Sequence, residues 1–392
     1  KMYAHPSGGM IYVLDSATGE RRESTLLDLE NLTGLLDALN RIECLATLVS
    51  PRDVEESLRD VYAAACMLRN STKHLQVAPN DSSSLDYIID MAAALVGTKE
   101  ELSKRPIITV VVSPTSPLSY SNDAADIVIK SADSGLPVSI LPSPLAGATS
   151  PVSLAGTLVQ QNAEILAGNL LAQATKPKSL VTYSPRPLSI DMKTGAAGYG
   201  SVEYAMMSTV AVQLAKYYGI PSDIAGFGTN SKIPDQQAGF ERAATALFPS
   251  LAGPNLLDGA GILDADVTTC PEQLVIDNEI LGMIQRVRQG ISVGREMLAL
   301  DILAEIGPEG TFLGHRHTRE LFASEHYVPS LFDRNLRNTW ENAGARDLVK
   351  AAKDQVKVIL KTHVREHLEK SIDEELNRIL SIASRALHRD SN

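Results

Sequence analysis

The sequence has 392 residues, of which 44% are hydrophobic and 21% charged, and its formal net charge is −11. These values are typical of a globular protein with one large domain or two domains. The negative charge, and the lack of Lys and Arg clusters interleaved with aromatic residues, argue against a nucleic-acid partner. No apolar run reaches the roughly 18 residues of a membrane span.

The cysteines bear on the redox compartment of the protein, and the first residue bears on whether the sequence is a fragment. Cys44, Cys66 and Cys270 are far apart and odd in number, so we expect neither a disulfide framework nor a zinc site. Free thiols are typical of a reducing compartment, which predicts a cytoplasmic protein. Lys1 is not an initiator methionine and no signal-like segment follows it, which is consistent with a fragment.

In chain order, a small hairpin is expected at Met10 to Leu14 with its turn at Gly19, and a helical leucine pattern follows from Leu29 to Ile42. Seven apolar β runs then alternate with helical patterns. The runs are Cys44–Val49, Leu75–Ala78, Ile107–Val112, Val138–Leu141, Leu180–Tyr183, Ile224–Phe227 and Asn255–Ile262. The helices are expected at Leu58–Leu68, Leu85–Val96, Ala124–Ala132, Leu154–Ala174, Ser201–Tyr218, Gln236–Phe248 and Glu272–Gln289.

This alternation predicts a parallel sheet whose strands are covered on both faces. At this count we expect an α/β fold of the (β/α)8 TIM-barrel type, with additional C-terminal helices. Thr311–His315, after a helix at Glu296–Ile306, is the candidate eighth strand. An open doubly wound sheet is the alternative, but the glycines from Gly195 to Gly200 are spaced wrongly for a dinucleotide-binding loop.

The predicted domain division lies near residue 330. Residues 1–330 would form the barrel with its N-terminal hairpin, and residues 331–392 a helical extension packed on the barrel. Ala345 to Leu387 is highly charged with apolar residues on one side. These helices either pack on the barrel or offer a docking surface to a partner or a second subunit, as in a homo-oligomer.

Reactive groups in such a barrel lie at the carboxyl ends of the strands. The residues there are Ser50, Pro79-Asn80, Ser113–Tyr120, Pro142–Thr149, Ser184–Asp191, Gly228–Ser231 and Asp264. The stretch from Gly226 to Glu241 is rich in small residues, hydroxyls and amides. We therefore predict that Gly228, Thr229, Asn230 and Ser231 bind substrate. The alternative is an ordinary connection with Asp235 as helix cap.

Aromatic residues also gather near the expected strand ends, although they are only 5% of the chain. They are Tyr120, Tyr183, Tyr199, Tyr204 and Phe227. Aromatic faces hold cations that cannot donate hydrogen bonds, which describes a quaternary ammonium group. We predict substrate contacts for Tyr183, Tyr204 and Phe227, while each taken alone is also a plausible packing residue.

Three further residues are candidates for chemistry. Glu203 follows Ser201 at a helix start, where it either compensates the helix dipole or points at the barrel mouth. His315 and His317 would lie on one face of the expected eighth strand, but without a third ligand we expect no metal and favour a polar binding role. Glu203 and His315 are the predicted catalytic residues, and His317 a substrate contact.

Several stretches of the sequence, taken together, resemble those of a known protein family. They are Leu145-Ala-Gly-Ala-Thr-Ser-Pro-Val-Ser-Leu-Ala-Gly, Tyr199-Gly-Ser-Val-Glu-Tyr, Ser231-Lys-Ile-Pro-Asp-Gln-Gln-Ala-Gly-Phe-Glu, Asp277-Asn-Glu, Phe312-Leu-Gly-His-Arg-His-Thr, and Pro329-Ser-Leu-Phe-Asp-Arg followed by Trp340. In this order they resemble the trimethylamine methyltransferase family, particularly its members without pyrrolysine. The resemblance covers nearly the whole chain.

The resemblance implies a (β/α)8 barrel that moves a methyl group from a methylated amine to the Co(I) corrinoid, a cobalamin, of a partner corrinoid protein. Founding members carry pyrrolysine, whereas this chain has only standard residues, so the resemblance favours a quaternary amine such as glycine betaine as the donor. In that case His315 would bind the carboxylate, and Glu203 and Tyr204 the ammonium. The alternatives are a zinc-dependent corrinoid-to-thiol methyltransferase and a non-catalytic protein that binds a quaternary ammonium.

Overall fold

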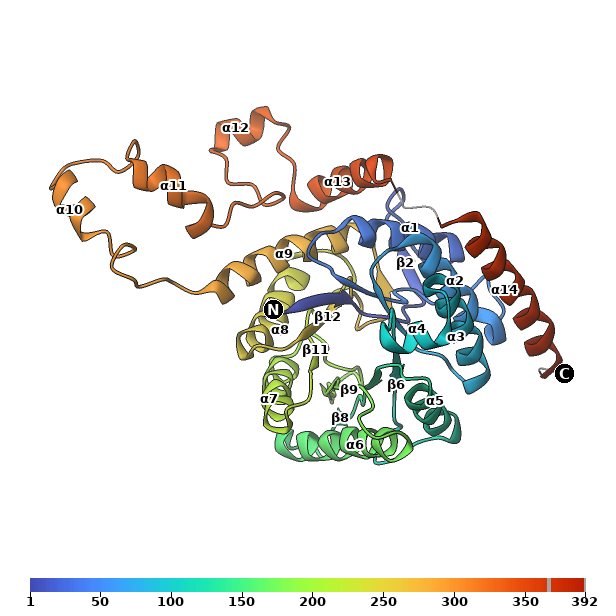
Figure 1. Ribbon diagram of the computed structural model, residues 1–392. Helices are drawn as coiled ribbons and strands as arrows, with labels where there is room; N and C mark the ends of the chain where they lie inside the picture. Colours follow the sequence, from blue (N-terminus) through green and yellow to red (C-terminus); the bar gives the residue numbers. More distant parts are fainter. Residues whose placement is uncertain (365–367, 391–392) are drawn as a thin grey trace.

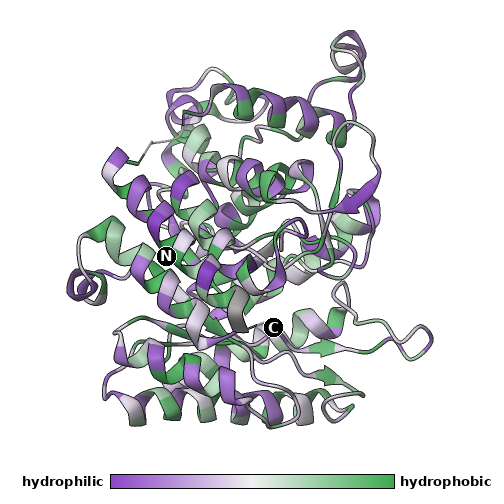
Figure 2. Cartoon of the chain, turned by 90° about the vertical axis from the view of Figure 1, so that its right-hand side faces the viewer, coloured by the Kyte–Doolittle hydropathy of each residue, from purple (hydrophilic) through white to green (hydrophobic). Residues whose placement is uncertain are grey.

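The computed structural model describes residues 1–364 and 368–390. Its body is a barrel of parallel strands surrounded by helices, with one segment extending away from it (Figure 1). The helices that face the viewer in Figure 2 carry bands of both hydropathies, as expected for helices with one buried and one exposed face. Within the described residues, no helix combines the length and the apolar character that crossing a membrane requires.

The barrel strands lie in chain order around the wall. They are β1 (Tyr3–Pro6), β4 (Cys44–Ala46), β5 (His74–Val77), β6 (Ile108–Val112), β7 (Val138–Ile140), β9 (Val181–Tyr183), β11 (Asp223–Ala225) and β12 (Leu256–Ala260). Strands β4 to β9 form one parallel sheet, and β1, β12 and β11 form another. The expected β runs are therefore strands, although several are shorter than their apolar stretches.

Two junctions close the barrel between these sheets. The amide of Tyr183 in β9 donates to the carbonyl of Pro221, next to β11, at 2.8 Å. On the other side, the amide of Glu43 donates to the carbonyl of Ala4 in β1 at 3.0 Å. The predicted (β/α)8 barrel is thus confirmed, and the open doubly wound sheet is not formed.

The expected eighth strand at Thr311–His315 was wrong. That stretch has no strand structure and leads into a helix for which His315 is the N-cap. The missing strand is β1, at the start of the chain, which pairs in parallel with β12. Its sequence escaped detection because His5 and Pro6 interrupt any apolar run, while His5 is satisfied inside the barrel by distant carboxylates.

Helices α1 to α9, without the short α4, follow the barrel strands in turn. They are α1 (Leu26–Ala38), α2 (Arg59–Asn70), α3 (Ser82–Val96), α5 (Asn122–Asp133), α6 (Leu154–Thr175), α7 (Val202–Tyr218), α8 (Gln236–Ala252) and α9 (Pro271–Gln289). Smaller elements are β2 (Tyr12–Leu14), β3 (Arg21–Glu23), the 3-10 turn Glu56–Leu58, α4 (Lys99–Lys104), β8 (Leu145–Ala146), β10 (Leu188–Ser189) and β13 (Thr268–Thr269). Strands β2 and β3 form an antiparallel hairpin between β1 and α1.

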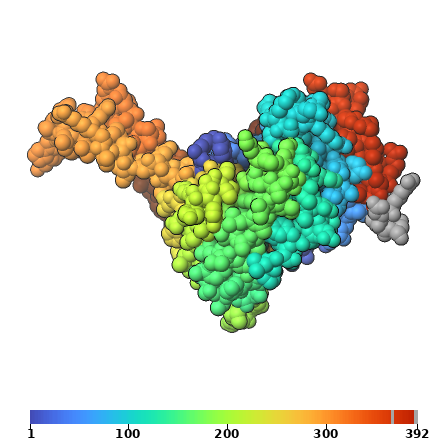
Figure 3. Space-filling model, turned by 60° about the horizontal axis from the view of Figure 1, so that its bottom comes forward, coloured from blue at the N-terminus to red at the C-terminus, as the bar shows by residue number. Residues whose placement is uncertain are grey.

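After α9 the chain leaves the barrel as an arm, which we define as residues 290–345 (Figures 1 and 3). It contains α10 (Leu300–Ile306), α11 (Arg316–Glu325) and α12 (Arg337–Asn342). No residue from 290 to 350, all of which the structure describes, is buried. The arm spans residue 330, so the division at that position stays a proposal.

Two C-terminal helices return to the barrel. Helix α13 (Leu348–Thr362) packs on α9 and α1, and α14 (Lys370–Asp390) packs on α3 and α2. Their apolar faces join the main core, with Val356 of α13 and Leu376 of α14 buried in it. The charged faces of both helices remain in solvent, as the sequence pattern of this region indicates.

Candidate functional site

A cavity of about 250 Å³ opens at the carboxyl ends of the barrel strands. It is lined by His5, Pro6, Ser7, Gly8, Gly9, Ala46, Thr47, Gln76, Ala78, Val111, Ser113, Leu141, Ser143, Arg186, Tyr199, Tyr204, Asp258, Ile262 and Asp266. These residues come from seven of the barrel strands, from the loops that follow them or, in the case of Tyr204, from the first turn of α7. This is where barrel enzymes place their active sites.

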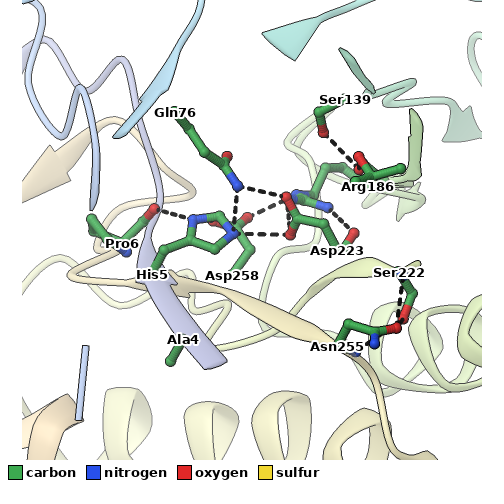
Figure 4. Close-up of polar contacts among 12 residues, drawn as sticks. Ala4, His5, Pro6, Gln76, Ser139, Arg186, Ser222, Asp223, Asn255 and Asp258 are labelled. Carbon is green, nitrogen blue, oxygen red and sulfur yellow. Dashed lines mark hydrogen bonds and ion pairs between the residues drawn. The ribbon is translucent and has the colours of Figure 1, made fainter. Parts of the chain in front are cut away.

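A buried polar network forms one wall of this cavity (Figure 4). His5 Nε2 lies 2.9 Å from Asp223 Oδ1, and His5 Nδ1 lies 3.3 Å from Asp258 Oδ1. Arg186 joins the same two carboxylates, with Nε donating to Asp258 Oδ2 at 2.7 Å and a terminal nitrogen donating to Asp223 Oδ1 at 3.0 Å. Gln76 Nε2 donates to Asp223 Oδ2 at 3.0 Å. The network therefore ties together β1, β5, β11, β12 and the loop after β9.

The charges within this network balance. Burial lowers the pKa of His5, but Asp223 and Asp258 outweigh that effect and leave the pKa raised, which favours the imidazolium. Burial alone would raise the pKa of Asp223, yet His5 and Arg186 lower it well below its usual range. Burial raises the pKa of Asp258 above its usual value, although Arg186 and His5 lower it in part. Two basic groups thus face two carboxyl groups, and each of the three Arg186 nitrogens donates hydrogen bonds.

Asp266 is a further carboxylate at the cavity, and the loop that holds it is strained. Asp264, Ala265 and Asp266 have φ values of 52°, 56° and 69°. Such left-handed conformations are costly for residues with a side chain and persist where the surrounding structure enforces them. Ser7 Oγ donates to Asp266 Oδ2 at 3.1 Å, while the buried Oδ1 has no hydrogen-bond partner among the described residues. Half of this carboxylate is therefore left without a hydrogen bond, although the Oδ1 atom itself is shielded from solvent.

The surroundings of Asp266 shift its protonation. Burial of the carboxylate and the neighbouring charge of Asp258 raise the pKa of Asp266 to about 8, although Ser7, Arg186 and Tyr199 lower it in part. The residue as a whole is half-buried, although its Oδ1 atom is not exposed. A carboxyl group that titrates near neutral pH in a cleft is a typical sign of a functional site.

Two tyrosines complete the wall next to Asp266. The rings of Tyr199 and Tyr204 have centroids 5.9 Å apart and an interplanar angle of 39°. Burial raises the pKa of both phenols, so they are neutral at physiological pH. The lining of the cavity thus includes two uncharged aromatic side chains, of which Tyr204 is almost completely buried.

The loop from Gly228 to Ser231 supports these tyrosines but is not part of the cavity lining. A side chain at Gly228 would collide with the carbonyl oxygen of Tyr199 and lie 2.9 Å from Tyr204 Cε1. Asn230 Oδ1 accepts from the Gly200 amide at 2.9 Å. Thr229 and Ser231 are buried and bonded to Glu241 and Asp235, respectively. The four residues therefore act as a second layer behind the tyrosines.

The other residues predicted on the barrel rim lie in different places. Tyr204 lines the cavity, as expected. Tyr183 is buried, and its hydroxyl donates to Asn162 of α6 at 2.9 Å, while Phe227 is buried in the core. Glu203 lies half-exposed in the first turn of α7 and is not in the lining. Its position matches the helix-dipole interpretation.

The two predicted histidines lie in the arm and not at the barrel mouth. His315 caps α11 by accepting from the His317 amide at 3.1 Å, and its Nε2 lies 3.7 Å from Glu305 Oε1. His317 Nε2 is inaccessible and lacks a hydrogen-bond partner among the described residues. Neither residue lines the cavity, because the strand that would have carried them there does not form.

Sequence reasoning missed the residues of the network. His5 lies on the undetected strand β1, and Asp258 lies within an apolar run that was interpreted only as a strand. Arg186 follows β9 within the rim stretch Ser184–Asp191, and Asp266 lies two residues after Asp264, so position alone could have pointed to both. Among the described residues, no group of three or more His, Cys, Asp or Glu side chains is arranged to hold a metal ion.

Comparison with known proteins places this chain in a family. Residues 1–386 match the model of trimethylamine methyltransferase (MTTB). The chain is 38% identical over 368 residues to trimethylamine methyltransferase MttB1 of Methanosarcina acetivorans, covering 93% of this chain and 74% of the relative. It is 34% identical over 332 residues to glycine betaine methyltransferase of Desulfitobacterium hafniense, covering 84% and 69%.

A solved structure supports the same fold. The hydroxylamine complex of MtmB superimposes with a TM-score of 0.51 at 12% identity, covering 99% of this chain and 72% of that chain. The chain itself is written entirely in the twenty standard residues, as in members without pyrrolysine. The chain therefore belongs to the trimethylamine methyltransferase family.

Proposed function

We propose that this enzyme transfers a methyl group from a methylated amine, bound in the barrel cavity, to the Co(I) corrinoid of a separate corrinoid protein. The observation that carries the proposal is the cavity itself, where the unpartnered oxygen of Asp266 lies beside the neutral rings of Tyr199 and Tyr204. A carboxylate next to aromatic faces suits a methylated ammonium group, which is a cation without hydrogen-bond donors.

The size of the cavity supports a small methyl donor. Its volume of about 250 Å³ is below the roughly 300–1,000 Å³ of pockets for drug-sized ligands. A methylated amine is small enough for such a site, whereas a corrinoid is far larger than the space. The corrinoid would then be a second substrate, presented at the mouth of the barrel by its own carrier protein.

The reaction that we propose is a displacement at the methyl carbon. The bond between this carbon and nitrogen breaks, its electron pair stays on nitrogen, and a quaternary ammonium leaves as a neutral tertiary amine. The electron pair of the acceptor's cobalt forms the new bond to carbon. No proton moves in this step, so it needs no general acid or base, and His5 and the two carboxylates beside it are engaged with one another.

The residues of the chain would act on binding and orientation. Asp266 and the tyrosines hold the ammonium head, and the network of His5, Arg186, Asp223 and Asp258 keeps the strand ends in place around it. Asp266 stabilises the charged donor more than a transition state in which that charge is fading. We therefore class it as a binding residue, and the rate gain would come from positioning.

The experiment is a methyl-transfer assay followed by cobalamin absorbance. Methylated amines are offered one at a time with Co(I) cobalamin, either free or bound to a corrinoid protein of the same organism. We expect enzyme-dependent methylation with at least one quaternary amine. Saturable binding of these amines with no methylation of either acceptor would instead identify a non-catalytic binding protein and refute the proposal.

A further inference from the structure

We propose that the cavity selects a ligand with a net positive charge, a quaternary ammonium without a carboxylate, over a zwitterionic betaine. This inference rests on the proposed function, because it names the class of amine that the same cavity would take. At the cavity, the cations His5 and Arg186 are already paired with carboxylates, whereas the carboxylate of Asp266 has no paired cation.

The positively charged side chains at the cavity are already paired with carboxylates. Among the described lining residues, only His5 and Arg186 carry a positive charge. Both His5 nitrogens face carboxylates, and Arg186 donates to Asp258, to the side chain and carbonyl of Asp223, and to the carbonyl of Pro185. A ligand carboxylate would thus meet no unpaired cation here.

The negative charges exceed the positive ones by one when Asp266 is ionised. His5 and Arg186 are matched by Asp223 and Asp258, which leaves the Asp266 charge without a paired cation among the described lining residues, although Ser7 donates a hydrogen bond to it. Ser7, Tyr199, Tyr204, Asp258 and Arg186 are the polar and charged residues whose influence reaches it from the neighbouring loops and strands. A bound monocation would complete this balance.

Only the ammonium end of a betaine would find a favourable partner in the site. Its ammonium could lie beside Asp266 and the tyrosine rings, but its carboxylate is joined to the same nitrogen through a short linker and would remain near Asp266. Two like charges at such a separation repel one another in a poorly solvated site. The remaining donors of the lining are hydroxyls, such as those of Ser113 and Ser143, and backbone amides. These are weaker partners for a carboxylate than a cation is.

Choline and glycine betaine are matched probes, because they share the trimethylammonium group and differ in a hydroxyl versus a carboxylate. Calorimetric titration of the whole chain above pH 8, where Asp266 is ionised, compares their affinities. We expect choline to bind at least about tenfold more tightly, a difference of about 1.4 kcal/mol. Equal affinity or a preference for betaine would overturn the inference.

The Asp266→Asn variant tests the origin of this preference. It keeps a side chain that tolerates the left-handed backbone but removes the charge. We expect choline to lose about tenfold or more in affinity, so that the two ligands bind almost alike. Asp264→Asn is the matched control, because Asp264 lies in the same strained loop but pairs with Arg21 and Lys232 outside the cavity. It should leave the preference unchanged.

Proton exchange provides a readout that a purely structural role would not give. Choline beside Asp266 favours the ionised carboxylate, so binding near pH 8 should release protons from the wild type and none from Asp266→Asn. Titration in buffers of different ionisation enthalpy measures this release. If choline binds without any proton release in the wild type, Asp266 is not the group that holds it.

The methyl-transfer assay separates this inference from the proposed function. Methylation of cobalamin from glycine betaine, with betaine as the tighter ligand, would support the function and refute the charge preference. Preferential choline binding, with no methylation of cobalamin from any quaternary amine, would support the charge preference and refute the proposed function. Methylation from a donor without a carboxylate, lost in Asp266→Asn but retained in Asp264→Asn, would support both.

Discussion

His5 at the barrel mouth and His315 in the arm differ in their burial and in their charged partners. His5 is buried on β1, with two carboxylates facing its ring nitrogens and a guanidinium bonded to the same carboxylates. His315 lies at the start of a short helix in a segment with no buried residue, and the carboxylate nearest to it is exposed. The Gly-His-Arg-His-Thr string is the more conspicuous motif in the sequence, yet only the solitary His5 belongs to a preorganised polar site. The difference teaches that long-range pairing, not local motif density, defines the site.

The largest effect that we predict separates a buried ion pair from an exposed one. Arg186→Gln removes one of the two cations that face the buried Asp223 and Asp258, and breaking a buried ion pair typically costs about 3–5 kcal/mol of unfolding free energy. Arg337→Gln in the arm breaks the exposed pair with Glu341, worth about 0.2–1 kcal/mol, and a cation–π contact with Trp340, worth about 0.5–1 kcal/mol at exposed sites. Chemical denaturation of both variants measures the contrast. Comparable losses would mean that the network is not the stabilising centre described above.

A second prediction compares two glycines. Gly228→Ala places a methyl group against Tyr199 and Tyr204, which we expect to cost about 1–3 kcal/mol and to weaken binding of quaternary amines. Gly314→Ala in the arm meets open space and should leave both quantities nearly unchanged. Thermal melts and ligand titrations distinguish the two. Wild-type binding by a folded Gly228→Ala protein would show that the loop does not position the tyrosines.

The third prediction concerns pH. Because the pKa of Asp266 is about 8 in the folded chain and near 3.8 when unfolded, the folded state retains a proton that the unfolded state loses between these values. The contribution of Asp266 to stability therefore falls as pH rises from about 4 to 8 and then levels off. Asp266→Asn should remove this part of the pH dependence. Melting temperatures across the range test this, with Asp264→Asn as the control that should follow the wild type.

The smallest effects are expected for the arm histidines. His315→Ala and His317→Ala change half-exposed residues away from the cavity, so their effects should stay within about 0.5 kcal/mol of unfolding free energy. Affinity for choline and for glycine betaine should be unchanged as well. Selective loss of betaine binding in His315→Ala would restore the carboxylate-binding role first predicted from the sequence.

The sequence predicts the barrel strands better than it predicts the residues of the site. The wall strands from β4 to β12 are detectable because each lies in or beside a largely apolar run, such as Ile107–Val112, between turn residues. The site is less accessible to such reasoning because its partners are remote in the chain. His5 and Asp223 are separated by 218 positions, and Arg186 and Asp258 by 72. Tyr204 lies at the start of α7, after the loop that follows β9, so its aromatic type and its place near a strand end both pointed to the rim. The same signal also selected Tyr183 and Phe227, which are buried and do not line the cavity.

The most direct test is a structure of the chain with choline bound above pH 8. The site described above predicts the ammonium within about 6 Å of the ring centroid of Tyr199 or Tyr204 and next to the free oxygen of Asp266. The ligand should approach no guanidinium, and the arm should be unoccupied. Choline bound instead among α10 to α12, or between the C-terminal helices, would contradict the assignment of the barrel cavity as the binding site.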